Sequence, residues 1–187
     1  MKFKKARTLI ILGIILILLI LATVYIVLNN KNKKEEINEY IPQEEISESQ
    51  IRKTIISLYF KNNETNSVIP ESRCIDVKEL YNEPYKYLIE QLIKGPESEK
   101  LSCVIPEGTK VNSCTIKENT VYVDLSKEFI ENAKEGIDEE SMIVYSIVNT
   151  LTELNEVSEV KILIEGEENK SFKDNKISFK ENFKRND

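Results

Sequence analysis

Asp124 and Glu128 are the pair of carboxylates in this chain whose types and spacing suit general acid–base chemistry. Glycoside hydrolysis uses two such side chains, one to protonate the leaving oxygen and one to act as base or nucleophile. The residues around them favour a simpler role. Asp124 ends an apolar strand pattern, and Ser126 is placed to cap a helical turn, where a carboxylate also binds free backbone N–H groups. We therefore expect Asp124 to be structural.

The residue inventory limits the chemistry that the chain performs by itself. Histidine is absent, which removes the commonest general base and metal ligand, so Ser-His and Cys-His nucleophiles cannot form within the chain. The five glycines are not clustered, whereas a phosphate-cradling loop needs a glycine-rich run. The sequence therefore predicts no catalytic residue, no cofactor and no metal, and the chain is not expected to be an enzyme.

Three cysteines, Cys74, Cys103 and Cys114, lie far apart in the sequence. They form no C-x-x-C pair, and without histidine they do not complete a zinc site. Two interpretations stay open. Either the thiols are small buried hydrophobic groups, or Cys103 and Cys114 form a disulfide in an oxidising compartment and leave Cys74 free.

Residues 8–28 are uncharged and consist almost entirely of Ile, Leu and Val, with lysine-rich segments on both sides. A helix of about 21 residues is about 31 Å long, which matches a hydrocarbon core about 30 Å thick. The run is longer than the roughly 7 to 15 apolar residues of a signal peptide, and it lacks an A-x-A cleavage site. We therefore expect one uncleaved transmembrane helix rather than a removed signal peptide.

Basic residues set the expected orientation of this span. The short N-terminal segment, residues 1–7, holds four Lys or Arg, and three lysines follow the apolar run. The excess on the N-terminal side favours a cytoplasmic N-terminus. The expected localisation is therefore the cell membrane, with a single pass and an extracytoplasmic C-terminal domain.

Charge and composition divide the remainder of the chain. From Glu35 onward, 19 basic residues accompany 32 acidic residues, a net charge of −13. A field of that sign repels phosphate backbones, so we expect no nucleic-acid partner. Residues 29–50 are rich in Lys, Glu, Asn, Gln and Ser, a composition that buries too little apolar surface to fold, and they are predicted to be a disordered linker. Residues 51–187 have the size of one domain.

Apolar periodicity in this domain predicts a mixed α+β fold, because alternation is typical of strands and a spacing of three or four is typical of helices. Pro84 suits the first turn of a helix that Gly95 ends. Asn119 is expected to take the left-handed conformation in a hairpin loop, and Asp138 to cap the second helix. The predicted order is a strand at 53–60, an edge strand at 67–74, a helix at 84–94, strands at 110–116 and 120–125, a helix that ends near residue 154, and a strand at 160–164.

These elements predict a two-layer sandwich in which two helices cover one face of a single mixed or antiparallel sheet. Asn149 and Thr150, late in the second helix, are expected to tie it to a loop, with ligand binding as the alternative. The outer face of the sheet should be polar, yet four large apolar side chains lie on it. Either the C-terminal tail folds back over them, or they bind another protein. The candidate interaction face is Ile55, Tyr59, Tyr122 and Leu163, and the apolar tail residues are Phe172, Ile177, Phe179 and Phe183.

Six short segments follow one another along residues 54–185 in a recognisable order. None is specific alone, but together, with this spacing, they resemble the GerMN domain family of sporulation and spore germination. The segments are Leu58–Phe60, Leu92–Pro96, Val104–Thr109, Val121–Ser126, Val148–Glu153 and Val160–Gly166.

The resemblance implies a domain of endospore-forming bacteria that is not known as catalytic and whose fold is similar to the ring-building modules of secretion systems. It implies an assembly or binding role in sporulation, germination or cell-envelope complexes, with envelope or sporulation proteins, peptidoglycan or a second copy of the chain as partners. The chain departs from the lipoprotein members in its transmembrane anchor and its single domain copy. A peptidoglycan-acting enzyme that uses carboxylates only, or an extracytoplasmic sensor, is the alternative.

Overall fold

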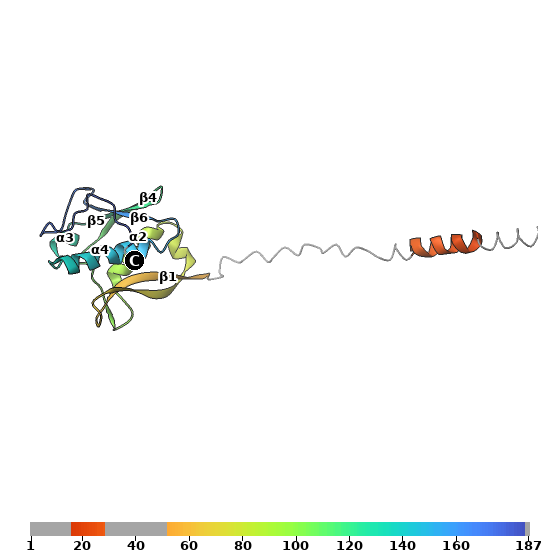
Figure 1. Ribbon diagram of the computed structural model, residues 1–187, viewed down its shortest axis with the longest axis horizontal. Helices are drawn as coiled ribbons and strands as arrows, with labels where there is room; N and C mark the ends of the chain where they lie inside the picture. The colour runs from red at the N-terminus through yellow and green to blue at the C-terminus, as the bar shows by residue number, and fades with distance from the viewer. Residues whose placement is uncertain (1–15, 29–51, 186–187) are drawn as a thin grey trace, which may run out of the picture. The chain divides into compact units, whose positions relative to one another are not determined.

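The computed structural model of the chain describes residues 16–28 and 52–185 (Figure 1). The chain divides into two units, residues 1–49 and residues 50–187, and each is described by itself. The predicted linker at 29–50 lies outside the described residues.

In the first unit, residues 16–28 form a helix whose apolar side chains are exposed. The other part of the predicted span 8–28, and the basic segment 1–7, lie outside the described residues. Within the stretches that the structure does describe, no helix has the length and apolar character needed to cross a membrane.

The described part of the second unit, residues 52–185, contains two three-stranded sheets. In the first sheet, β1 is central, with antiparallel β2 on one side and the short β3 on the other. Leu58 and Phe60 of β1 point into the core and are buried. Pro70, which lacks an N–H group, lies on the edge strand β2, as predicted. The bounds are β1 (Lys53–Asn62), β2 (Val68–Asp76) and β3 (Leu101–Ser102).

In the second sheet, β5 lies between β4, which is antiparallel to it, and β6, which is parallel to it. Val121, Val123 and Leu125 of β5 alternate into the core and are fully buried. Val160 and Ile162 of β6 are buried beside them. The bounds are β4 (Val111–Lys117), β5 (Thr120–Leu125) and β6 (Glu159–Ile164).

Two helices, α2 and α4, contact strands of both sheets, and Figure 1 shows them between the sheets. Pro84 begins α2 and Gly95, with φ 89°, follows its last residue, as predicted. Ile143, Ile147 and Leu151 form the buried seam of α4, but the helix ends at Leu151, before Leu154, where the sequence predicted its end. The bounds are η1 (Val77–Leu80), α2 (Pro84–Lys94), α3 (Glu128–Glu131) and α4 (Ile137–Leu151).

The α+β class is confirmed, but the prediction of a single sheet is wrong, because the described strands form two sheets. Hydroxyl groups of α4 explain why the sheet does not continue beyond β1 at Tyr59. On the edge of β1 that faces away from β2, the backbone groups of Tyr59 form hydrogen bonds with side chains of α4 rather than with a neighbouring strand. The Tyr59 N–H donates to Thr150 Oγ1 at 3.0 Å, and Ser146 Oγ donates to the Tyr59 carbonyl at 2.6 Å. Buried backbone groups need partners, and here a helix supplies them, so Thr150 ties α4 to a strand rather than to a loop.

Three local predictions are also corrected. The residue with positive φ in the β4–β5 turn is Glu118, at 54°, rather than Asn119. Lys117 pairs directly with Thr120, so the loop contains only Glu118 and Asn119 and is shorter than the three residues expected. Helix α4 begins after Gly136, so Asp138 lies in its first turn and does not cap it. The Ser126 hydroxyl was expected to cap α3, but it accepts the Lys110 N–H at 3.0 Å, and the N-cap residue of α3 is Lys127.

The C-terminal segment folds back onto the domain, as one of the two interpretations predicted. Phe172 and Phe179 are buried, with ring centroids 5.1 Å apart, and both rings lie within 6.0 Å of the Phe129 ring of α3. Phe183 exchanges two backbone hydrogen bonds with Val160, at 2.8 and 2.9 Å, and so covers the outer edge of β6. The tail is therefore part of the core.

Candidate functional site

The four residues of the candidate interaction face lie on two different sheets. Ile55 and Tyr59 belong to β1, whereas Tyr122 and Leu163 belong to β5 and β6. Ile55 is 72% exposed, and Tyr122 and Leu163 are half-buried. The structure therefore does not bring the four side chains onto the one sheet face that the sequence predicted.

Tyr59 is buried beneath the C-terminal tail, with 7% of its surface exposed. The Arg185 guanidinium lies 5.4 Å from the centre of its ring, and Arg185 Nη2 donates to the phenol oxygen at 2.6 Å. The phenol in turn donates to Glu153 Oε1 at 2.7 Å. Of the predicted face, Ile55 is thus the side chain most available to a partner.

Asp124 and Glu128 each make contacts that differ from those of a catalytic pair. Asp124 Oδ1 accepts the Gly166 N–H at 2.9 Å, which joins the end of β5 to the turn after β6. Hydrogen bonds from the Ser126 side chain and from its own backbone N–H lower the pKa of Glu128. A general acid in glycoside hydrolysis needs a raised pKa, so this environment favours the opposite protonation state. Asp124 has the structural role expected of it, with a different partner.

The three cysteines are free thiols in the structure, so the predicted alternative of a Cys103–Cys114 disulfide is wrong. Cys74 is exposed on β2, which corrects the expectation of burial for that residue, and Cys103 and Cys114 are half-buried. Burial raises the pKa of Cys114 to about 12 and also raises that of Cys103. Because the thiolate is the reactive form, these two thiols are poor nucleophiles.

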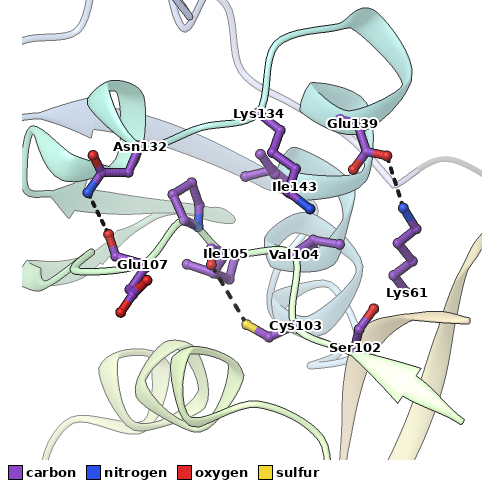
Figure 2. Close-up of a pocket in the computed structure, with 11 residues that line it drawn as sticks. Lys61, Ser102, Cys103, Val104, Ile105, Glu107, Asn132, Lys134, Glu139 and Ile143 are labelled. Carbon is purple, nitrogen blue, oxygen red and sulfur yellow. Dashed lines mark hydrogen bonds and ion pairs between the residues drawn. The ribbon is translucent and has the colours of Figure 1, made fainter. Parts of the chain in front are cut away.

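A cleft of about 330 Å³ opens where the end of β1, the loop after β3 and the start of α4 meet (Figure 2). Its apolar lining comes from Val104, Ile105 and Ile143. Lys61 of β1 and Glu139 of α4 form an ion pair of 2.9 Å at one end of the cleft. Small-molecule sites occupy about 300–1,000 Å³, so the cleft is at the lower end of that range.

Both walls of the cleft are held by side-chain contacts. Cys103 Sγ donates to the Leu92 carbonyl of α2 at 3.3 Å. Asn132 Nδ2, in the loop between α3 and α4, donates to the Glu107 carbonyl at 2.8 Å (Figure 2). These two bonds fix the loop after β3 against α2 and against the end of α3, while the Lys61–Glu139 ion pair joins β1 to α4. These contacts define the walls of the cleft.

Sequence reasoning missed this cleft. Its charged residues come from three separate parts of the chain, and no motif or period connects them: they are Lys61, Glu107, and the pair Lys134 and Glu139. The nearest signal was the segment Val104–Thr109, which contributes to the family resemblance although no predicted helix or strand contains it. A conspicuous loop of this kind is where binding residues are often found.

A second cluster of ionisable groups joins the first turn of α4 to the tail. Glu140 is 1% exposed, and its Oε2 has no hydrogen-bond partner. Burial raises the pKa of Glu140 to about 7, and the adjacent carboxylate of Asp174 and, more weakly, Glu135 add to the rise, while Lys176 opposes it. Lys176 Nζ lies 3.0 Å from Asp174 Oδ2. Glu140 is thus a buried carboxyl group that favours its neutral form.

This cluster predicts that stability falls as the pH rises toward neutrality. The pKa of Glu140 is about 7 in the folded chain and near 4.5 in a model peptide, so its contribution is complete below about pH 4.5 and is lost as the pH rises to about 7. Glu140→Gln removes that titration, and the variant should be more stable than the wild type at about pH 8, by at least about 1 kcal/mol. Urea unfolding at about pH 5 and pH 8 measures the difference. The exposed control Glu168→Gln should follow the wild type, and an identical pH dependence for both variants contradicts the assignment.

Comparison with known proteins gives a consistent result. The profile of the Germane family, described as sporulation and spore germination, matches residues 57–170, more than half of the chain. The spore germination protein GerM of Bacillus subtilis is 38% identical over 88 residues, which cover 44% of this chain and 23% of that protein. The chain thus spans less than a quarter of the length of this relative.

Two solved structures resemble the fold. The tandem GerMN domains of the sporulation protein GerM from Bacillus subtilis align over 72% of this chain and 46% of theirs, with a TM-score of 0.59 and 22% identity. The first GerMN domain of the same protein aligns over 61% of this chain and 84% of its own, with a TM-score of 0.51 and 26% identity. The first of these likenesses concerns the fold alone.

Proposed function

The chain belongs to the Germane family of sporulation and spore germination, and from this premise we propose that it is a membrane-anchored, non-catalytic module that binds or assembles other envelope proteins. The family match over residues 57–170 is the observation that carries the proposal. The apolar run at 8–28 supports the anchor. The lack of histidine and the engaged state of Asp124 support a binding role rather than catalysis.

The proposed topology has a cytoplasmic N-terminus, one membrane pass and an extracytoplasmic domain. Protease added to intact protoplasts should then degrade the C-terminal domain and leave a short protected fragment that contains residues 8–28. A domain that resists protease until the protoplasts are lysed contradicts this topology.

The partner surface is proposed to include Ile55, which is exposed on β1. A photo-crosslinking amino acid at Ile55 in the full-length chain should capture a specific envelope protein, and should do so more strongly in sporulating than in growing cells. The same amino acid at Lys100, which is exposed before β3, is the matched control. Equal capture at both positions, or none at either, argues against a defined surface at Ile55. Capture of the chain itself from Ile55 identifies a homo-oligomer.

A separate assay distinguishes the binding module from an enzyme. The purified full-length chain is incubated with peptidoglycan, and the release of soluble fragments is measured. We expect co-sedimentation at most, without release. Release that disappears in the Asp124→Ala, Glu128→Ala double variant contradicts the proposed function and supports the carboxylate mechanism.

A further inference from the structure

Among the described residues, the cleft beside α4 contains one cation without a partner. Lys61 is neutralised by Glu139 at 2.9 Å, whereas Lys134 makes no ion pair or hydrogen bond within residues 52–185. Figure 2 shows the Lys134 side chain extending from the loop before α4 toward Val104, while the Glu107 side chain points away from it. An anion next to Lys134 would therefore meet a positive charge that no side chain within residues 52–185 contacts.

The surface below Lys134 is apolar. Ile105 and Ile143 are buried, at 9% and 3% exposed, and Val104 is half-buried. Binding sites for small molecules combine such an apolar lining with a few polar groups that fix the orientation of the ligand. A ligand that matches the cleft has a negative group and a short aliphatic part next to it.

From this arrangement we propose that the cleft binds a small carboxylate that carries an aliphatic side chain, such as an N-acyl amino acid or the C-terminal residue of a peptide. Lys134 binds the carboxylate by a charge-assisted hydrogen bond. The aliphatic side chain packs on Val104, Ile105 and Ile143. The volume of about 330 Å³ limits the occupant to about one or two amino-acid residues. This site is independent of the partner surface at Ile55, so either proposal can fail alone.

The pre-formed walls favour such binding. The loop after β3 is already fixed by the contacts of Cys103 with Leu92 and of Asn132 with Glu107. Ordering of the site, which is one of the costs of binding a small molecule, is therefore small here. The Lys134 side chain is exposed, and it is the group that a bound carboxylate would order.

The test uses the full-length chain in detergent with isotope-labelled methyl groups of Ile and Val. N-acetylleucine should shift the signals of Val104, Ile105 and Ile143 in a saturable way. N-acetylleucinamide, which has the same shape without the charge, should bind at least about tenfold more weakly. N-acetylglycine, which lacks the aliphatic group, should also bind more weakly.

Two variants complete the test. Lys134→Gln should bind N-acetylleucine about tenfold more weakly while its ligand-free methyl spectrum stays that of the folded wild type. Lys94→Gln, at the exposed end of α2, should bind like the wild type. The proposal is overturned by the absence of saturable shifts at the three methyl positions, by equal binding of acid and amide, or by full affinity in Lys134→Gln.

Discussion

Replacing Phe179 with alanine is expected to lower the free energy of unfolding by about 3–5 kcal/mol. Phe179 is fully buried, and its ring lies 5.1 Å from that of Phe172 and 6.0 Å from that of Phe129. The substitution removes the buried ring and leaves a cavity that neighbouring rings cannot fill. Natural domains are stable by about 5–15 kcal/mol, so the loss is a large part of the total. Urea unfolding followed by circular dichroism measures it.

The expected result has a control and a stronger form. Phe183→Ala should cost less, because that side chain is only partly buried. A chain truncated after Lys170 keeps the whole family-matched stretch, 57–170, yet loses both buried tail rings, and it should not fold. A cooperative unfolding transition in the truncated chain, close to that of the wild type, refutes the structural role given to the tail.

Arg73→Ala is expected to have an effect of similar size, about 3–5 kcal/mol, because it breaks a buried ion pair from one side. Arg73 is 7% exposed and donates from Nε and Nη2 to Glu71 Oε1, at 2.9 and 2.7 Å. It also donates to the Gly95 carbonyl, and its guanidinium lies 5.3 Å from the Phe60 ring centre. The substitution leaves the Glu71 carboxylate without its cation.

Glu71 also accepts hydrogen bonds from backbone N–H groups, and these identify the segments that the ion pair connects. Burial by itself raises the pKa of Glu71, but hydrogen bonds from the Ser98 N–H, Arg73 and the Glu97 N–H outweigh it, so the pKa is lowered. The pair thus joins β2 to the turn after α2. Arg73→Met with Glu71→Gln should recover much of the loss, because no buried charge is left unpaired. Lys100→Ala, at an exposed position, should change stability by less than about 0.5 kcal/mol. Wild-type stability in Arg73→Ala contradicts this account.

Much of the fold follows from the sequence because single elements leave periodic signals. The alternation in residues 53–60 predicted β1, and the apolar spacing between Pro84 and Gly95 predicted α2. Each of these signals depends on one buried face, so it can be read without knowing what covers that face. The family resemblance followed from such segments in order, and the profile match confirms it.

The arrangement of the elements did not follow, because it depends on contacts between distant residues. A single sheet was the simplest packing for the predicted strands, but Ser146 and Thr150 of α4 take the edge positions at Tyr59. Hydroxyl groups late in a helix do not indicate their partners. Tyr59 was expected on the outer face of the sheet, under the tail or a partner, and Arg185 of the tail does cover it. Its second partner, Glu153, lies just after α4 and was not indicated by any pattern.

The same long separation explains why the cleft was missed. One of its two cations, Lys134, lies in a loop without periodicity, and the floor of the cleft includes Ile143, which a helical pattern assigns to the core. Composition excluded nucleic acid and histidine chemistry but did not indicate where a ligand would fit. A pocket of this kind is a property of the assembled fold.

The backward path of residues 172–185 links the end of the described domain to its first strand. Phe172 and Phe179 enter the core, and Arg185 lies over the Tyr59 ring of β1. Segments that contribute buried side chains open together with the core that they join, whereas fraying is confined to segments with few buried contacts. Amide hydrogen exchange in residues 172–183 should therefore be as slow as in the strands of the core.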